Sequence, residues 1–170
     1  MQFDELLDRR RSTRAFSRDS ISEDQVRSIL EAANKAPSAG NLQAYGIFAV
    51  SDHDKLTDLV AAAKGQEFIA EAPICFVFCA DPERSESEYG KRGRDLYSIQ
   101  DATIAATFAI LKAVDLGLAS VWVGSFDEER VSNIIGAYKL RPVAIIPVGH
   151  GAENPEAKPR RKLSSLVHEM

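Results

Sequence analysis

The chain has 170 residues, of which 45% are hydrophobic and 27% charged, so it is long enough for one globular domain and too short for two ordinary ones. Its formal net charge of −4 argues against general nucleic-acid affinity, which requires a surplus of Lys and Arg. Nine of the 21 basic residues nevertheless lie in two short windows: Arg9, Arg10, Arg11, Arg14, Arg18, Lys158, Arg160, Arg161 and Lys162.

The composition does not favour a disulfide framework, a metal site or a membrane segment. Cys75 and Cys79 are too few for a disulfide scaffold or a four-thiolate zinc site, and their spacing predicts that both are buried on one face of a strand. The histidines show no metal-binding spacing. No apolar stretch approaches the roughly 20 residues of a membrane span, and the first residues do not resemble a signal peptide. We therefore expect a cytoplasmic protein with no metal, no membrane contact and no nucleic-acid partner.

Apolar periodicity and capping residues predict the elements of the first half of the chain. Ser22 to Gln25 has the pattern of a capping box, in which the Ser and Gln side chains satisfy backbone N–H groups of a new helix. Pro37 predicts where that helix must already have ended. In order, we expect a helix over 2–10, a loop over 11–21, a helix from Ser22, a strand over Tyr45–Val50 and a helix from Ser51 to about Lys64.

The second half contains the most apolar segments. Pro73–Ala80 is a continuous apolar run, typical of a strand buried on both faces. Residues 81–94 are polar and contain glycine, which predicts a mobile excursion. Leu96–Asp115 is a helix apolar on almost all sides, as expected in a core or subunit interface. The remaining elements are a strand over Ala119–Val123, a helix from Ser125 to Gly136, a strand over Arg141–Val148 and one helical turn within 163–168.

These elements indicate an α+β fold in which helices pack on one central sheet, in a single domain over residues 1–170. A doubly wound nucleotide-binding fold is less consistent with the sequence. No GxGxxG segment joins a strand to a helix, and no Walker A loop occurs.

The two basic windows are the first candidate for a binding site. Arg10 to Arg14 places three guanidinium groups and two hydroxyls within five residues. Arginine forms bidentate, charge-assisted hydrogen bonds with phosphate, and a serine adds a neutral donor. Lys158–Lys162 forms the second cluster. Taken alone, each cluster is more simply explained as a solvated basic stretch, whereas together they are consistent with a local anion.

Two loops of small residues are further candidates. Pro37–Gln43 combines Ser, Gly and Asn, so its backbone and side-chain amides could approach a planar ligand closely. Trp122–Ser125 follows a strand and contains a glycine just before a new helix, which leaves backbone N–H groups free to point at a ligand. Taken alone, each loop is more simply explained as an ordinary turn between two elements.

Taken in order, these segments resemble the nitroreductase family of FMN enzymes along the whole chain. The resemblance rests on Arg10–Arg14 followed by Phe16, Ala36–Gln43, Gly65-Gln66 leading to Ala72-Pro73, Leu116–Leu118 before Trp122–Gly124, and Pro147–Gly149 with the Lys158–Arg160 tail. It implies an α+β fold with a central, mostly antiparallel sheet flanked by helices. It also implies that homodimerisation completes the domain and that FMN binds at the subunit interface.

The resemblance implies that the basic windows hold the phosphate, the ribityl chain and the pyrimidine edge of FMN. The residues concerned are Arg10, Arg11, Ser12, Arg14, Lys158, Arg160 and Arg161. Among them, Arg14 would lie near the N1–C2=O edge of the flavin. A cation there stabilises the negative charge that this edge carries when the ring is reduced.

The resemblance also implies that the two loops contact the flavin ring. The partner subunit would contribute Pro37, Ser38, Ala39 and Asn41. The same subunit would contribute Gln66, Trp122, Val123, Gly124 and Ser125. Gly124 would offer its backbone N–H to flavin N5, and Gln66 would contact the polar edge of the ring. Because the flavin itself performs the chemistry, no catalytic side chain is implied.

The implied reaction is two-electron transfer from NADH or NADPH, through FMN, to a nitroaromatic, quinone or similar conjugated acceptor. Three alternatives remain open: a reductive dehalogenase, a flavin-fragmenting enzyme and a non-catalytic FMN-binding dimer. A small nucleic-acid-binding module fits the acidic composition poorly. The chain departs from the family where Ala44 and Tyr45 stand in place of a Pro and an aromatic residue, and residues 81–94 are all that remain to cover the substrate side.

Overall fold

The apolar run after Pro73 forms the central strand β2 (Ile74–Ala80) of an antiparallel sheet in the computed structural model, which describes residues 1–170. The sheet has four strands in the order β1-β2-β4-β3, with β1 at Tyr45–Val50, β4 at Arg141–Gly149 and β3 at Ala119–Ser120. Every residue of β2 is buried, which confirms the prediction made from its composition. Val77, for example, lies between Phe48 of β1 and Ile145 of β4.

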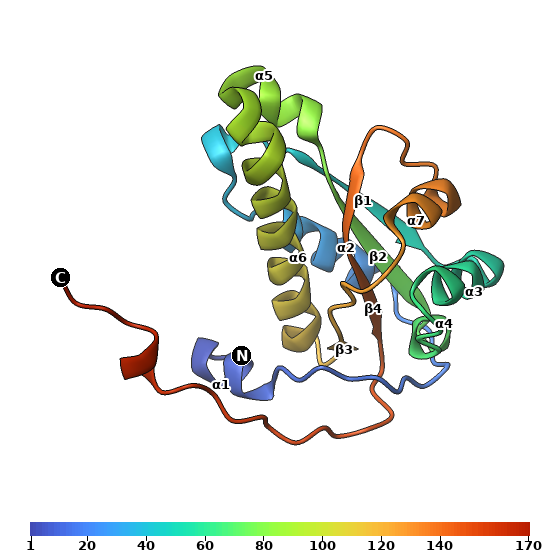
Figure 1. Ribbon diagram of the computed structural model, residues 1–170. Helices are drawn as coiled ribbons and strands as arrows, with labels where there is room; N and C mark the ends of the chain where they lie inside the picture. Colours follow the sequence, from blue (N-terminus) through green and yellow to red (C-terminus); the bar gives the residue numbers. More distant parts are fainter.

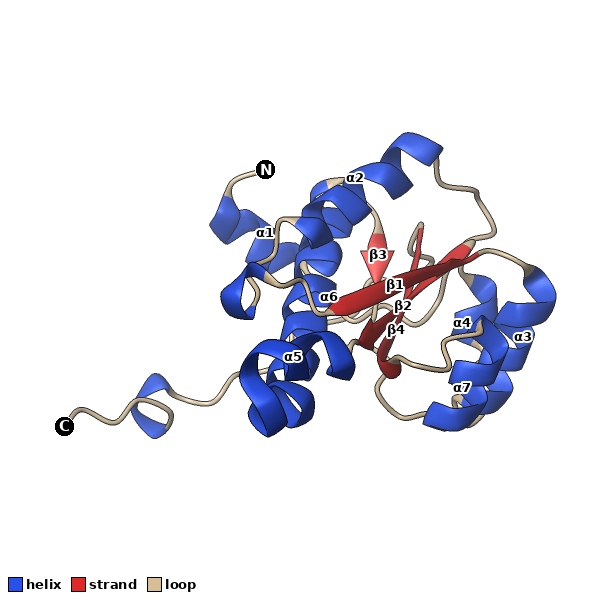
Figure 2. Cartoon of the chain, turned by 90° about the horizontal axis from the view of Figure 1, so that it is seen from above, coloured by secondary structure: helices blue, strands red, loops and turns tan.

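Helices cover both faces of the sheet, as Figure 2 shows from above. On one face lie α2 (Glu23–Asn34) and α6 (Ser98–Asp115), and on the other α3 (His53–Ala62), α4 (Phe68–Glu71) and α7 (Glu128–Ile135). Alternate side chains of β2 supply the two cores. Ile74, Phe76 and Phe78 pack with α2 and α6, and Cys75, Val77 and Cys79 pack on the other side. The predicted α+β fold and the shared face of the cysteines are confirmed.

The largest correction concerns residues 81–94, which form helix α5 (Pro82–Arg92) and the start of a π-helical segment, η2 (Gly93–Tyr97), rather than a mobile excursion. The Asp81 side chain accepts the Arg84 N–H at 3.0 Å, and Pro82 occupies the first helical position. These are start signals for a helix. The segment is polar because most of its side chains are exposed, and this polarity concealed the helix in the sequence.

The observed ends of several elements also differ from the predicted ends. The capping residue of α3 is Asp52 rather than Ser51, and that of α7 is Asp127 rather than Ser125, because each aspartate accepts a backbone N–H three residues later. The strand expected over Ala119–Val123 pairs continuously only at Ala119–Ser120, and Val123 returns as an isolated bridge to Ile145. The capping box at Ser22 is present as predicted.

Helix α6 extends between two distinct regions of the molecule, visible in Figure 1. Its first turns adjoin α5 and the short η1 helix (Ala39–Asn41), and its last turn adjoins α1 (Phe3–Arg9). Its outer face carries apolar side chains that are only partly buried in a single copy, including Ile104 and Phe108. The exposed apolar face is consistent with the expected subunit interface.

The chain after β4 passes beneath α1 and ends in an extended tail that contains the short η3 helix (Leu163–Ser165) (Figure 1). The predicted helical turn is therefore confirmed over three residues. None of the helices combines the length and the apolar character needed to cross a membrane.

Candidate functional site

Folding brings the two basic windows together at the lower end of the sheet. Phe16 and Gly151 form an antiparallel bridge, and on either side of it backbone hydrogen bonds of 2.9 Å join Ser17 to His150 and Ala152 to Ala15. The backbone N–H of Thr13 also donates to the Ser120 carbonyl of β3 at 3.2 Å. The segment after α1 and the segment after β4 are therefore fixed side by side.

Between these segments lies a cavity of about 360 Å³. Its lining residues are Leu7, Asp8, Arg10, Arg11, Ser12, Arg14, Pro155, Glu156, Ala157, Lys158 and Arg160. Five of these side chains are cationic and two are acidic, so the lining carries a positive excess. We call the five cations Arg10, Arg11, Arg14, Lys158 and Arg160 the basic clamp.

The cations of the basic clamp are not neutralised within the chain. None of the five forms an ion pair with a carboxylate anywhere in residues 1–170. Arg11 instead turns onto the end of α1, where its guanidinium donates to the carbonyls of Asp8 and Arg10. Cations gathered around one cavity without partners favour an anion with several acceptor oxygens, such as a phosphate.

Arg161 is the one predicted clamp residue that the structure places elsewhere. It does not line the cavity, and its guanidinium donates to the Ser165 carbonyl of the η3 turn at 2.8 Å. In an extended segment successive side chains point to opposite sides, so adjacency in the sequence does not carry Arg161 to the cavity that Arg160 lines. The clamp of this structure therefore contains Arg160 but not Arg161.

The predicted ring-contacting residues of the same subunit also meet. The side-chain amide of Gln66 donates to the Ala63 carbonyl at 2.9 Å and to the Ser125 carbonyl at 3.2 Å. This contact holds the Trp122–Ser125 segment, which we call the Gly124 turn. Val123 is anchored by its paired bonds of 3.0 Å to Ile145, whereas the Trp122 side chain is 37% exposed.

The Gly124 turn presents backbone donors without partners. The N–H groups of Gly124 and Ser125 donate no backbone hydrogen bond, and both residues are exposed. A small cavity of about 200 Å³ adjoins Gly124 and is bordered by Ile99 and Arg141. An exposed N–H on a rigid turn can donate to an acceptor atom of a planar ligand.

The second predicted loop, Pro37–Gln43, lies beside the first turns of α6, at the end of the helix away from α1. We call it the small-residue loop. Ser38 accepts the Gln43 N–H with its hydroxyl at 3.0 Å, and the loop contains positive φ angles at Gly40, Asn41 and Gln43. Beside it is a cavity of about 540 Å³, lined by Pro37, Ser38, Ala39 and the first turns of α6. None of the basic clamp lines this cavity.

Two contributions to the small-residue loop could not be identified from sequence patterns. Asp101, in an otherwise apolar helix, is 2% exposed and accepts two backbone N–H groups of the loop region. Its charge, together with burial, raises the pKa of Tyr45. Arg84 of α5 donates to the Leu42 carbonyl at 2.6 Å. The only signal for Asp101 was a carboxylate inside an apolar run, and Arg84 lay in a segment expected to be mobile.

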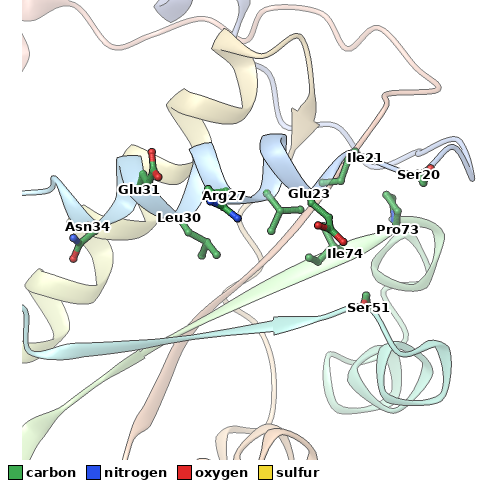
Figure 3. Close-up of a pocket in the computed structure, with 11 residues that line it drawn as sticks. Ser20, Ile21, Glu23, Arg27, Leu30, Glu31, Asn34, Ser51, Pro73 and Ile74 are labelled. Atoms are coloured by element: carbon green, nitrogen blue, oxygen red, sulfur yellow. The ribbon is translucent and has the colours of Figure 1, made fainter.

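A further cavity of about 710 Å³ lies between α2 and the ends of β1 and β2 (Figure 3). Its floor is apolar, with Leu30 and Ile74, and its polar side chains, such as Glu23 and Arg27, are exposed. None of the predicted site residues lines it. We assign it no ligand, because no buried polar group is directed into it.

The sequence matches the model of the nitroreductase family over residues 7–66 and 58–150. An oxygen-insensitive NADPH nitroreductase from Salmonella typhimurium is 30% identical over 175 residues, which cover 97% of this chain and 72% of that protein. Both alignments include the first basic window, the small-residue loop and the Gly124 turn.

Solved structures share the fold. The NADPH:FMN oxidoreductase from Vibrio harveyi, complexed with NAD⁺, superposes with a TM-score of 0.89 and 28% identity over 98% of this chain and 76% of that one. A nitroreductase family protein from Streptococcus pneumoniae has a TM-score of 0.90 at 22% identity and is covered completely, which shows the fold alone. The chain belongs to the nitroreductase family of oxidoreductases.

Proposed function

We propose that this protein is an FMN-dependent NAD(P)H oxidoreductase that acts as a homodimer on a nitroaromatic, quinone or similar conjugated acceptor. The observation that carries the proposal is the basic clamp, in which unpaired cations from both ends of the chain surround one cavity. The named activities of the Salmonella and Vibrio relatives support the nicotinamide donor and the flavin.

The residues of the clamp fit the phosphate of FMN. A phosphate dianion accepts several charge-assisted hydrogen bonds, and Arg10, Lys158 and Arg160 provide the donors without first breaking an ion pair. Ser12 adds a neutral donor to the same cavity. The guanidinium of Arg14, at the same cavity, would stabilise negative charge at the N1–C2=O edge.

The residues around the Gly124 turn fit the flavin ring. When bound, FMN accepts a hydride from the nicotinamide donor and delivers it to the acceptor. The Gly124 N–H, which no atom of the backbone accepts, would donate to ring nitrogen N5. Gln66 keeps that N–H in position by holding the Ser125 carbonyl. The exposed face of Trp122 would exclude water from one side of the ring.

In this proposal, a second copy brings the small-residue loop to the same FMN. The loop is bonded to α6 at Asp101, and α1, which leads into the basic clamp, is bonded to α6 at Asp115 through the chain terminus at 3.4 Å. The helical rise between these two positions amounts to about 21 Å. The loop of one copy therefore lies far from its own clamp, and an antiparallel partner would place it beside the other clamp.

The proposal is tested by FMN titration followed by anaerobic reduction. We expect the protein to bind FMN, with flavin absorption near about 450 nm that NADH or NADPH bleaches and a quinone or nitroaromatic restores. A protein that does not change the fluorescence of added FMN would contradict the proposal. Binding without bleaching by either nicotinamide would favour the non-catalytic dimer. Reoxidation only by a halogenated acceptor would favour the dehalogenase alternative.

A further inference from the structure

Two side chains of other elements hold the small-residue loop: the exposed Arg84 at the Leu42 carbonyl, and the buried carboxylate of Asp101. Asp101 lies in the first half of α6, is 2% exposed and forms no ion pair. One carboxylate oxygen accepts the Ala39 N–H at 2.9 Å, and the other accepts the Ala44 N–H at 3.3 Å. The two amides mark the beginning and the end of the turn that contains Gly40 to Gln43.

The backbone of this loop needs such support. Gly40 and Asn41 both have φ of 55°, and Gln43 has φ of 45°, a region that residues with a Cβ adopt reluctantly. Within the loop, only neutral groups hold this shape, chiefly the Ser38 hydroxyl that accepts the Gln43 N–H. Asp101 supplies the one carboxylate acceptor, and hydrogen bonds to a carboxylate are of the stronger, charge-assisted kind.

Asp101 borders the cavity beside the loop, but both of its carboxylate oxygens are already bonded to backbone amides of the loop region, which favours a positioning role over direct contact with a ligand. Ala102, Ala105 and Ala106 of the same helix are fully buried, and the Asp101 side chain is nearly so. An isolated buried carboxylate is unfavourable unless its oxygens are hydrogen-bonded. Both oxygens here accept backbone amides of the loop region, so the hydrogen bonds of this carboxylate fix the loop.

We propose that Asp101 is the positioning residue of the cofactor loop: its carboxylate, held between the Ala39 and Ala44 amides, sets the conformation in which the small-residue loop contacts FMN. The inference rests on the proposed function, since it takes that loop to be a flavin contact. It adds a residue of α6 that would not touch the cofactor yet controls how tightly, and in which geometry, the flavin is held.

The test compares Asp101→Asn with Asp52→Ala. The Asn side chain keeps the shape but replaces one acceptor oxygen with an NH₂ group that opposes a backbone donor. Asp52 caps α3, where it accepts the Lys55 N–H at 3.0 Å, and it contacts none of the proposed site. Because Asn caps a helix as well as Asp does, the control is Asp52→Ala, which removes a carboxylate-to-amide hydrogen bond elsewhere and reports a general loss of stability.

We expect Asp101→Asn to raise the Kd for FMN at least tenfold and to change the visible circular dichroism of the flavin even at saturating FMN. Asp52→Ala should lower thermal stability while leaving both readouts as in the wild type. A purely structural role for Asp101 would lower the melting temperature without altering the spectrum of the bound flavin. Wild-type affinity and spectrum in Asp101→Asn overturn the inference.

Hydrogen exchange in the wild-type apoprotein provides a second measurement, in case Asp101→Asn does not fold. We expect the Ala39 and Ala44 amides to exchange much more slowly than the neighbouring Gly40 amide, which has no backbone acceptor. Equally fast exchange at all three amides overturns the inference. If the wild-type protein does not bind FMN, both the proposed function and this inference are wrong. If the wild-type protein binds FMN and Asp101→Asn binds it equally well, only the inference is wrong.

Discussion

The carboxylate of Glu153 accepts the backbone N–H of Arg14 at 2.5 Å, although 139 positions separate the two residues. The contact continues the pairing of Phe16 with Gly151. It joins the two basic windows at the point where both enter the clamp cavity. The clamp is therefore part of the folded body rather than an encounter between two free ends of the chain.

Replacing Arg10 or Arg14 with Ala is expected to weaken FMN binding while the protein stays folded. Each arginine contributes charged hydrogen bonds worth about 1.5–3 kcal/mol, so the Kd for FMN should rise at least about tenfold. Flavin fluorescence titration measures the affinity, and far-ultraviolet circular dichroism monitors the fold. Arg9→Ala is the matched control, because Arg9 pairs with Glu5 and does not line the cavity. Unchanged affinity in Arg10→Ala would refute the phosphate assignment, and unchanged affinity in Arg14→Ala would refute the ring-edge assignment.

Mixed dimers can determine whether the small-residue loop acts on the partner's cofactor. One copy carries Arg14→Ala, and the other carries Ser38→Ala with Asn41→Ala. If clamp and loop come from different copies, each mixed dimer regains one intact site, and random pairing restores about a quarter of the wild-type FMN content. Each variant alone should bind little FMN. If clamp and loop act within one copy, mixing restores nothing.

The buried thiols predict a loss of stability in alkaline solution. Burial raises the pKa of Cys79 to about 12 and raises that of Cys75 as well, from 9.0 in both cases. The unfolded chain therefore ionises first, and the free energy of unfolding should fall as the pH rises above about 9. Urea unfolding at about pH 8 and about pH 10 measures this change. Cys75→Ala combined with Cys79→Ala should flatten the profile, and an equally steep profile would contradict the assignment.

Gly93→Ala is expected to destabilise the junction between α5 and η2 by about 1–3 kcal/mol. Gly93 is buried, and an added Cβ would lie 2.8 Å from the Ser85 carbonyl carbon and equally close to the Tyr89 Cβ. Chemical denaturation measures the loss. Gly46→Ala is the control, since the nearest atom there is the end of the Leu140 side chain, which can rotate away. A loss no larger than that of Gly46→Ala would show that the junction adapts.

The buried half of the fold could be predicted from sequence because burial leaves a compositional pattern. The run Pro73–Ala80 indicated a doubly covered strand, and the capping box at Ser22 located the start of α2. Helix α5 could not be predicted in the same way. Its exposed polar residues carry no apolar periodicity, and its start depends on one hydrogen bond from Arg84 to Asp81.

The candidate site, like the fold, could be predicted only where its residues leave a pattern in the sequence. The residues expected in the clamp share a charge and occur in clusters, so the sequence indicated all of them, and only Arg161 lies outside the cavity. Asp101 was not found because its partners are backbone amides more than fifty positions away. A contact of this kind depends on how α6 packs against the loop, and no local pattern records that packing.

The length of α6 has a consequence for the protein in dilute solution. If this helix separates the two halves of each cofactor site, a solitary copy holds only half of the groups that bind FMN. Cofactor occupancy should then depend on protein concentration as well as on FMN concentration. Dilution far enough to separate the copies would release the flavin. The flavin absorption of the protein would therefore report how much of it is dimeric.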